Sequence, residues 1–330
     1  MKNYIIFLLG IVTLFINSCN SKQIKSSYLP TVVGGAGEIL VVIDKAKWES
    51  SLGDTIRSIF SAPMPQSIQG EPYFTLVQTT EKSISDLLKK HRNILFISIK
   101  PKQPANYGFK EDVYATPQII GYVNAPSVDS MINLMERDGK IIRQKYIYKE
   151  IERWKDIFEK AYNIKDVNEL RKKQKYYVKI PRGYSLDVNK PGFIWISSET
   201  RDITLGIIGW DYPYKSKDQL QPSELIKKRD EVLKQNVPGP VNNSYMKTET
   251  LIKPETQEFI YKGKYFIRME GLWKLENAFM GGPFVSLTTV DDKNNRIITV
   301  EGFIYAPRKA KRNMLRQLEG VLFTLTLDKN

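Results

Sequence analysis

The stretch 284-FVSLTTVDDKNNRIITVEGFIY-305 decides the fold of the second half of the chain. Two runs rich in β-branched and aromatic residues, 284–290 and 296–305, flank the polar segment 291–295. Runs of this composition around a short segment rich in Asp and Asn are typical of two antiparallel strands joined by a hairpin turn. The stretch therefore predicts an antiparallel sheet in this part of the chain.

The rest of the second half has the same character. Asp166 is a candidate N-cap for a short helix at 167–174, and a helix over 223–235 stops before Pro238. Pro307 opens a closing helix in which leucines recur on one face. This order predicts an α+β domain whose mainly antiparallel sheet is packed with helices. Further strands are predicted at 176–180, 192–197, 203–210, 245–251 and 265–273.

The first half alternates apolar strands with helices. Its long last helix carries aromatic and aliphatic residues at helical spacing on one face. We therefore expect two domains, an N-terminal α/β domain at 33–165 with a long closing helix and a C-terminal α+β domain at 166–330. Within the first domain, strands are predicted at 38–43, 73–78, 93–99 and 118–123, and helices at 47–60, 84–91 and from Pro126 to about Tyr162.

Residues 1–18 have the features of a signal peptide, with Lys2 before a short apolar run. The tetrapeptide INSC that ends at Cys19 resembles a bacterial lipobox, which implies that Cys19 carries acyl chains such as palmitate. The polar residues 19–32 then form a tether. We expect a lipoprotein of the cell envelope, and Asn20, in place of a retention aspartate, favours the outer membrane. Whether it faces the periplasm or the cell surface stays open, and an ordinary secretory leader is the alternative.

Composition limits the partners. The chain has 330 residues, 42% of them hydrophobic, and a formal net charge of +14. The apolar content is enough to build cores without disulfides. In the envelope, a basic protein favours anionic lipid, an acidic glycan or another envelope protein as partner, and the compartment excludes nucleic acid. A surface solvated by lysine is the alternative explanation of the charge.

Residue counts exclude several kinds of site. The chain has one cysteine and one histidine, so no Cys/His zinc cluster can form, and we expect neither a metal nor a cofactor. A Ser-His-Asp hydrolase would have to use His91. His91 lies among cations at a predicted helix end, where positive charge complements the helix dipole. The glycines at 34–37 precede a strand, whereas a phosphate-binding glycine turn follows one.

A glycine-rich segment in the second half is a candidate binding groove. Two adjacent glycines permit close approach of the backbone to a ligand, and aromatic residues surround them. A tight turn between two core strands is the alternative. The predicted groove residues are Trp273, Phe279, Gly281, Gly282, Phe284, Glu270 and Glu301.

Carboxylates are the acids left for catalysis. The candidates are Glu249 in YMKTE, Glu270 in RMEGLW and Glu301 before Gly302. Two carboxylates about 5–10 Å apart across a groove would permit glycoside hydrolysis. A carboxylate-dependent hydrolase that acts on envelope glycans is therefore one hypothesis for the function, although we assign no catalytic residue.

A basic cluster starts the closing helix, comprising Arg308, Lys309, Lys311 and Arg312. Cations in the first turn of a helix oppose its dipole, so we expect no structural gain from their position. Contact with headgroup phosphates or an acidic partner is one interpretation, and a solvated face is the other.

Several unusual strings connect the chain with a known family. They are Gly37–Asp44, Pro238–Pro240, Tyr245–Glu249, Gly271–Trp273, Met280–Phe284 and Glu301–Pro307. With the lipobox, they resemble an uncharacterised envelope lipoprotein family of the Bacteroidota, domain-of-unknown-function family 4837. The resemblance implies an envelope lipoprotein and no particular activity. The element order over residues 176–330 also resembles the PsbP-like (Mog1-like) α+β fold.

Together these observations favour a non-catalytic binding or scaffold module held at the envelope by lipid. The glycan hydrolase is the alternative, and the geometry of the carboxylates separates the two hypotheses.

Overall fold

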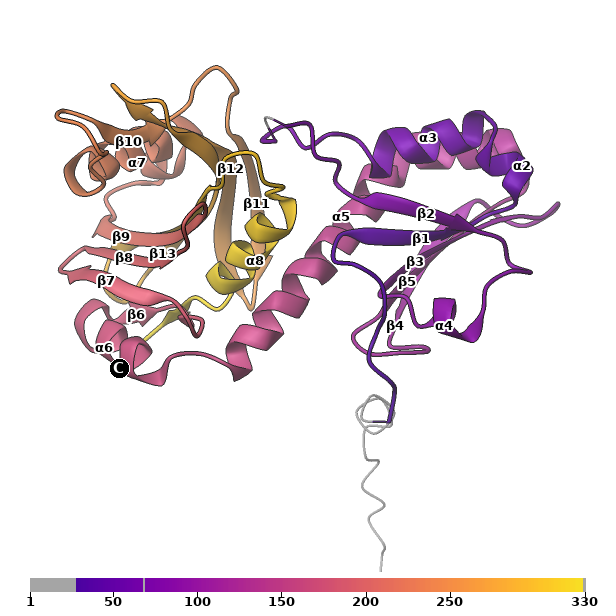
Figure 1. The fold of residues 1–330 in the computed structure, drawn as a ribbon, viewed down its shortest axis with the longest axis horizontal. Helices are drawn as coiled ribbons and strands as arrows, with labels where there is room; N and C mark the ends of the chain where they lie inside the picture. Colours follow the sequence, from indigo (N-terminus) through magenta and orange to yellow (C-terminus); the bar gives the residue numbers. More distant parts are fainter. Residues whose placement is uncertain (1–27, 68, 329–330) are drawn as a thin grey trace, which may run out of the picture.

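The protein forms two lobes connected by one long helix (Figure 1). The computed structural model describes residues 28–67 and 69–328. The signal peptide, Cys19 and most of the tether predicted from the sequence lie outside these residues. Within the described part of the chain, no helix is long and apolar enough to cross a membrane.

The N-terminal lobe is built on a five-stranded sheet with strand order β2-β1-β3-β5-β4. Its first four strands in that order are parallel, and β4 pairs with β5 antiparallel. The central strands β1 and β3 are continuous apolar runs because a parallel sheet is covered on both faces. The strands are β1 (Glu38–Val42), β2 (Thr75–Thr79), β3 (Asn93–Ile99), β4 (Asn106–Glu111) and β5 (Ile119–Ala125).

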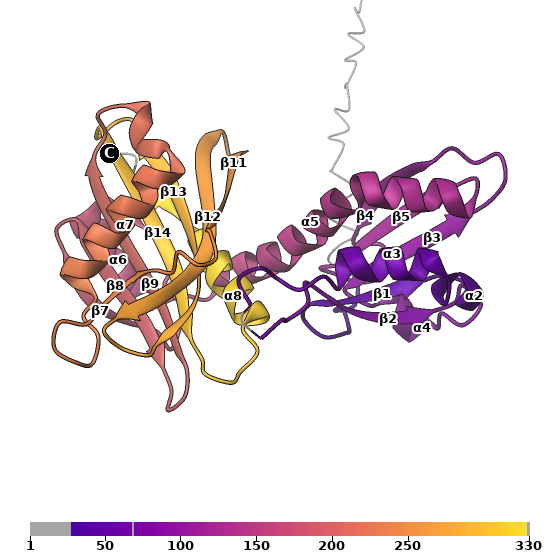
Figure 2. The same cartoon turned by 90° about the horizontal axis from the view of Figure 1, so that it is seen from above.

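Two long helices and two short ones accompany this sheet. The two long ones, α3 and α5, pack against each other, and α5 extends from the N-terminal lobe to the C-terminal one (Figure 2). The helix predicted at 47–60 is two helices, because the Ser50 side chain accepts a hydrogen bond from the Leu52 N–H and starts α3. The helices are α2 (Lys45–Trp48), α3 (Ser51–Phe60), α4 (Asp86–Lys89) and α5 (Val128–Lys160).

The C-terminal lobe contains an eight-stranded sheet in which every pair is antiparallel. The order is β10-β12-β13-β14-β9-β8-β7, and β11 pairs as an edge strand with the first half of the long strand β12. The strands are β7 (Ser185–Lys190), β8 (Phe193–Glu199), β9 (Thr204–Pro213), β10 (Tyr245–Thr248), β11 (Glu255–Tyr261), β12 (Lys264–Glu276), β13 (Gly281–Asp291) and β14 (Arg296–Tyr305).

Two helices pack on opposite faces of this sheet. Phe284 and Val285 are neighbours on β13, so their side chains point to opposite faces of the sheet. Phe284 belongs to the apolar cluster that contains residues of α7, and Val285 to the cluster that contains residues of α8. The α8 cluster continues through α5 into the core of the N-terminal lobe, so the lobes share one apolar core. The remaining elements are α6 (Ile164–Gln174), β6 (Tyr176–Tyr177), η1 (Lys217–Leu220), α7 (Pro222–Asn236), α8 (Arg312–Leu322) and β15 (Thr326–Leu327).

The α+β class predicted from the sequence is confirmed, and the hairpin at 284–305 forms as β13 and β14. The N-cap of α6 is Asn163 and not Asp166, whose own N–H donates the cap hydrogen bond to the Asn163 side chain. The closing helix begins at Arg312, later than expected, because residues 307–309 form a turn with Arg308 at positive φ. The exposed strands β4, β7 and β11 were not predicted.

Candidate functional site between the lobes

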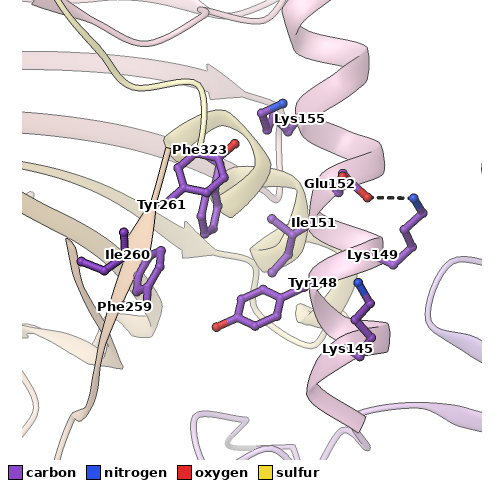
Figure 3. Close-up of a pocket in the computed structure, with 10 residues that line it drawn as sticks. All are labelled: Lys145, Tyr148, Lys149, Ile151, Glu152, Lys155, Phe259, Ile260, Tyr261 and Phe323. Atoms are coloured by element: carbon purple, nitrogen blue, oxygen red, sulfur yellow. Dashed lines mark hydrogen bonds and ion pairs between the residues drawn. The ribbon is translucent and has the colours of Figure 1, made fainter. Parts of the chain in front are cut away.

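An apolar pocket of about 350 Å³ lies where α5 meets β11 and the end of α8. Figure 3 shows Tyr148 and Ile151 of α5 facing Phe259 and Tyr261 of β11, with Phe323 behind them. Phe259 and Tyr261 are two residues apart on β11, so their side chains point to the same side of the strand. The Tyr261 and Phe323 rings meet edge to face, with centroids 5.2 Å apart. The pocket is therefore walled by aromatic side chains from both lobes.

Lysines of α5 rim this pocket, and carboxylates hold their ammonium groups. Lys149 contacts Glu111 and Glu152 at 2.8 Å each, and Lys155 contacts Glu159 at 3.0 Å. The Lys149–Glu152 contact is drawn in Figure 3. Because these charges are paired, the apolar wall is the distinctive feature of the pocket.

A second, polar hollow of about 270 Å³ adjoins the first along α5 and β11. The two meet at Tyr148, which lines the apolar pocket, and Gln257, which lines the polar one, and the Tyr148 hydroxyl donates to Gln257 at 3.3 Å. On its floor, Arg268 binds Glu319 through Nε and Nη2 at 2.5 and 2.9 Å, and Glu270 through Nη2 at 2.6 Å. Burial raises the pKa of Glu270, because its charged form loses hydration.

Two further arginines reach the polar hollow from α5 and α8. The Arg143 guanidinium stacks on the Tyr73 ring at 3.8 Å, and the Arg316 Nη2 donates to the Tyr73 carbonyl at 2.7 Å. Burial lowers the pKa of Arg316 to about 10 and also lowers that of Arg143. Nε of Arg143 and Nη1 of Arg316 are buried and have no hydrogen-bond partner. These arginines are functional candidates that the sequence did not reveal.

A third hollow, of about 660 Å³, lies in the N-terminal lobe at the carboxyl ends of the parallel strands. Asp44 follows β1 there, Lys100 follows β3, and the stacked Phe96 and Tyr122 rings line one wall. Ligands of open parallel sheets bind at such carboxyl ends, where the strand order reverses. This hollow has an aromatic wall and one buried acceptor without a partner, Oε1 of Gln103, whereas the pockets between the lobes combine aromatic walls with unpartnered guanidinium donors.

The groove residues predicted from the sequence do not form a groove. Trp273 is buried and donates its indole N–H to the Ile304 carbonyl at 3.1 Å, and Phe284 is fully buried beneath the Arg229 guanidinium. Phe279 is fully exposed. Gly281 and Gly282 begin β13, and a Cβ at Gly282 would lie 2.0 Å from the Ile304 oxygen. The glycines therefore allow close packing of strands.

The three predicted carboxylates have different surroundings. Glu301 is fully buried and binds Arg229 of α7 through two contacts of 2.7 and 2.8 Å. Glu249 contacts Lys274 at 3.2 Å and accepts a hydrogen bond from the Leu251 N–H. Glu270 alone of the three lines a hollow. The structure thus brings no two of them together across one site.

The basic cluster at the start of α8 contains residues that contact the N-terminal lobe and residues that are exposed. The Glu71 carboxylate of the N-terminal lobe accepts the backbone N–H groups of Lys311 and Arg312 at 2.6 and 2.9 Å. Arg312 also donates to the carbonyls of Pro72 and Ala36. The expectation that these cations gain nothing structurally is wrong for Arg312, because it ties the lobes together. Arg308 and Lys309 are exposed.

His91 is buried at the start of β3, with Nδ1 2.8 Å from the Asn93 carbonyl and Nε2 3.7 Å from Glu38. Burial lowers its pKa. In residues 28–67 and 69–328, no group of three His, Cys, Asp or Glu side chains is placed to hold a metal ion.

Family models match both lobes. Residues 163–324 match the family described as Domain of unknown function (DUF4837), and residues 32–159 match Domain of unknown function (DUF8532). The two matched regions adjoin each other in the sequence, and neither description assigns a function. The string Gly37–Asp44, grouped above with the first family, lies in the region that matches the second. A comparison with curated proteins gives no significant match.

Two solved structures resemble the chain distantly. A mutant of protein Mog1 has a TM-score of 0.30 and 12% identity, over 47% of this chain and 92% of that one. The human StarD13 lipid transfer and protein localization domain has a TM-score of 0.22 and 9% identity, over 48% and 92%. At these scores, neither structure is evidence for function. The regions that the two models match meet at the apolar pocket, so both regions contribute walls to the candidate site.

Proposed function

We propose that the protein is a non-catalytic binding module whose pocket between the lobes holds an apolar group of another envelope component. The observation that carries this proposal is the pocket of about 350 Å³ walled by Tyr148, Ile151, Phe259, Tyr261 and Phe323. Ligand sites are mostly apolar and aromatic concavities, and they occur preferentially at domain interfaces.

The proposal includes anchoring of the chain in the envelope of a member of the Bacteroidota through acylated Cys19. The lipobox sequence supports it, and the acyl chains would give durable membrane attachment. Growth with an alkyne-tagged fatty acid tests this step. The chain should take up the tag and Cys19→Ala should not, whereas equal labelling of both would reject the anchor.

Site-specific photocrosslinking in cells tests the binding function. A photoreactive amino acid replaces Ile260, which lies between Phe259 and Tyr261 at the rim of the pocket and is 69% exposed, with its side chain on the outer side of β11, where a partner that fills the pocket would extend. In the matched control it replaces the fully exposed Phe279. We expect a discrete crosslinked species from position 260 and none of the same mass from position 279. Neither substitution removes a buried side chain, so both proteins should fold. The same products from both positions, or none from position 260, would reject the pocket as a binding site.

One observation favours a hydrolase as the second candidate function. Glu270 lines a hollow, its pKa is raised by burial as a general acid requires, and Glu255 lies directly opposite it in the β11–β12 register. Against this function, Arg268 already binds the Glu270 carboxylate. Release of soluble sugar from purified envelope glycan, lost in Glu270→Gln, would establish the hydrolase, and the absence of release from the unsubstituted chain would reject it.

A further inference from the structure

Two guanidinium groups in the polar hollow have N–H groups without a partner. Arg143 uses Nη1 on the Ile59 carbonyl at 2.7 Å and stacks on Tyr73. Arg316, only 4% exposed, uses Nη2 on the Tyr73 carbonyl. Nε of the first and Nη1 of the second remain buried and unsatisfied. Both arginines line the same hollow of about 270 Å³.

Unsatisfied buried donors are rare in folded proteins, because each leaves its lost hydration uncompensated. A guanidinium is weakly hydrated, always charged and shaped to bind two oxygens of a carboxylate or phosphate. Both arginines contact Tyr73, Arg143 at the ring and Arg316 at the carbonyl, so the two guanidinium groups lie beside the same residue of the hollow. This arrangement suits an oxyanion better than an uncharged group.

The carboxylates of the hollow do not satisfy these donors. Glu270 and Glu319 are both bound by Arg268, and Glu255 is an exposed residue of the edge strand. Three arginines and three glutamates line the hollow, so an anion there would be held by directed N–H groups rather than by net charge.

The polar hollow and the apolar pocket lie on consecutive residues of α5, since Ile147 lines the first and Tyr148 the second. We propose that the protein binds an amphipathic oxyanion, with its carboxylate or phosphate group at Arg143 and Arg316 and its apolar part in the aromatic pocket. This inference rests on the proposed binding function and adds the chemical class of the ligand.

Calorimetric titration tests the inference with probes of matched chain length. Decanoate, decyl phosphate and uncharged decanol are titrated below their aggregation concentrations, and inorganic phosphate is a fourth probe. The chain starting at Asn20 is suitable, because it keeps every described contact. Decanoate or decyl phosphate should bind at least tenfold more tightly than decanol, and the preferred one of the two identifies the head group. Inorganic phosphate that binds as tightly as decyl phosphate would make free phosphate the ligand and overturn the amphipathic assignment.

Arg143→Gln is the decisive variant, because Arg143 is half-buried and its loss opens no cavity in the apolar core. It should weaken binding of the charged probes about tenfold to a hundredfold and leave decanol binding unchanged. Arg57→Gln is the matched control, since Arg57 stacks on Trp48 at 4.6 Å and donates to its carbonyl, away from both hollows. Arg57→Gln should bind every probe as the unsubstituted chain does.

The outcomes separate this inference from the proposed function. Equal affinity for decanol and the anions, or unchanged affinity of Arg143→Gln, would overturn the oxyanion site and leave the apolar pocket as a binding site. No binding of any ten-carbon probe, with a specific crosslink still obtained at position 260, would also overturn the inference alone. Loss of both results would reject the inference and the proposed function together.

Discussion

The contact of Glu71 with α8 gives a prediction that tests how the lobes are joined. The first turn of α8 has no side-chain cap from its own segment. Glu71, which lies in the N-terminal lobe about 240 residues earlier, accepts two of its N–H groups at 2.6 and 2.9 Å. The carboxylate therefore caps a helix of the other lobe, and its negative charge complements the positive end of the α8 dipole.

The size of the effect follows from these two hydrogen bonds. Loss of an N-cap costs about 0.5–2 kcal/mol, and loss of a favourable charge at a helix N-terminus costs about 0.3–1 kcal/mol. Glu71→Ala removes both contributions, so we expect local destabilisation of about 2 kcal/mol. Glu71→Gln keeps one acceptor oxygen without the charge and should cost about 1 kcal/mol.

Hydrogen exchange of backbone amides measures this effect where it arises. A change of about 2 kcal/mol corresponds to roughly thirtyfold faster exchange in the first turn of α8 for Glu71→Ala. Glu199→Gln is the control, because the Glu199 side chain is exposed and has no hydrogen bond or ion pair among the described residues. Unchanged exchange at Lys311 and Arg312 in Glu71→Ala would refute the cap, and so would equal changes in both variants.

Three further predictions concern buried groups. Burial lowers the pKa of His91 in the folded protein, so below pH about 6.5 the imidazole binds a proton more readily in the unfolded chain than in the folded one. The free energy of unfolding should therefore fall as the pH is lowered from that value. His91→Gln should lack this part of the pH dependence in urea unfolding. Glu301→Gln should cost about 3–5 kcal/mol in urea unfolding, because it leaves Arg229 buried without its countercharge, and Arg229→Met with Glu301→Leu should recover most of it; a small loss in the single variant would contradict this. Gly282→Ala should lower thermal stability strongly, since its Cβ would lie 2.0 Å from a backbone oxygen, whereas Gly108→Ala, with nothing within 4 Å, should be nearly neutral.

The apolar elements of this fold could be predicted from the sequence, and the exposed ones could not. Strands β3 and β14 have the bounds expected from their runs of apolar and β-branched residues, and no residue in either run is exposed. Strand β11, with sequence ETQEFIY, is mostly exposed and its polar residues hide the alternation. The sequence does contain one signal of the β11–β12 hairpin, which is Gly263 in the two-residue turn Lys262-Gly263. In the structure both turn residues have positive φ, a conformation that glycine adopts readily.

The candidate site was hidden for a related reason. It lies between the lobes, and its walls come from β11, α5 and α8, which are far apart in the sequence. Arg143 and Arg316 look like ordinary solvated charges of amphipathic helices, and only the docking of the lobes buries them. Glu270 lines the polar hollow, whereas the aromatic side chains of Trp273 and Phe284 are part of the core.

Competition between the amphipathic ligand and the crosslinked envelope component tests the central claim most directly. Cells that carry the photoreactive residue at position 260 or 279 are irradiated in the presence of increasing amounts of the preferred ten-carbon anion. The account predicts that the crosslinked species at position 260 disappears with the affinity measured by titration, while products at position 279 stay constant. A crosslink at position 260 that persists at saturating anion, or that falls equally at both positions, would contradict the claim that the pocket between the lobes binds this partner.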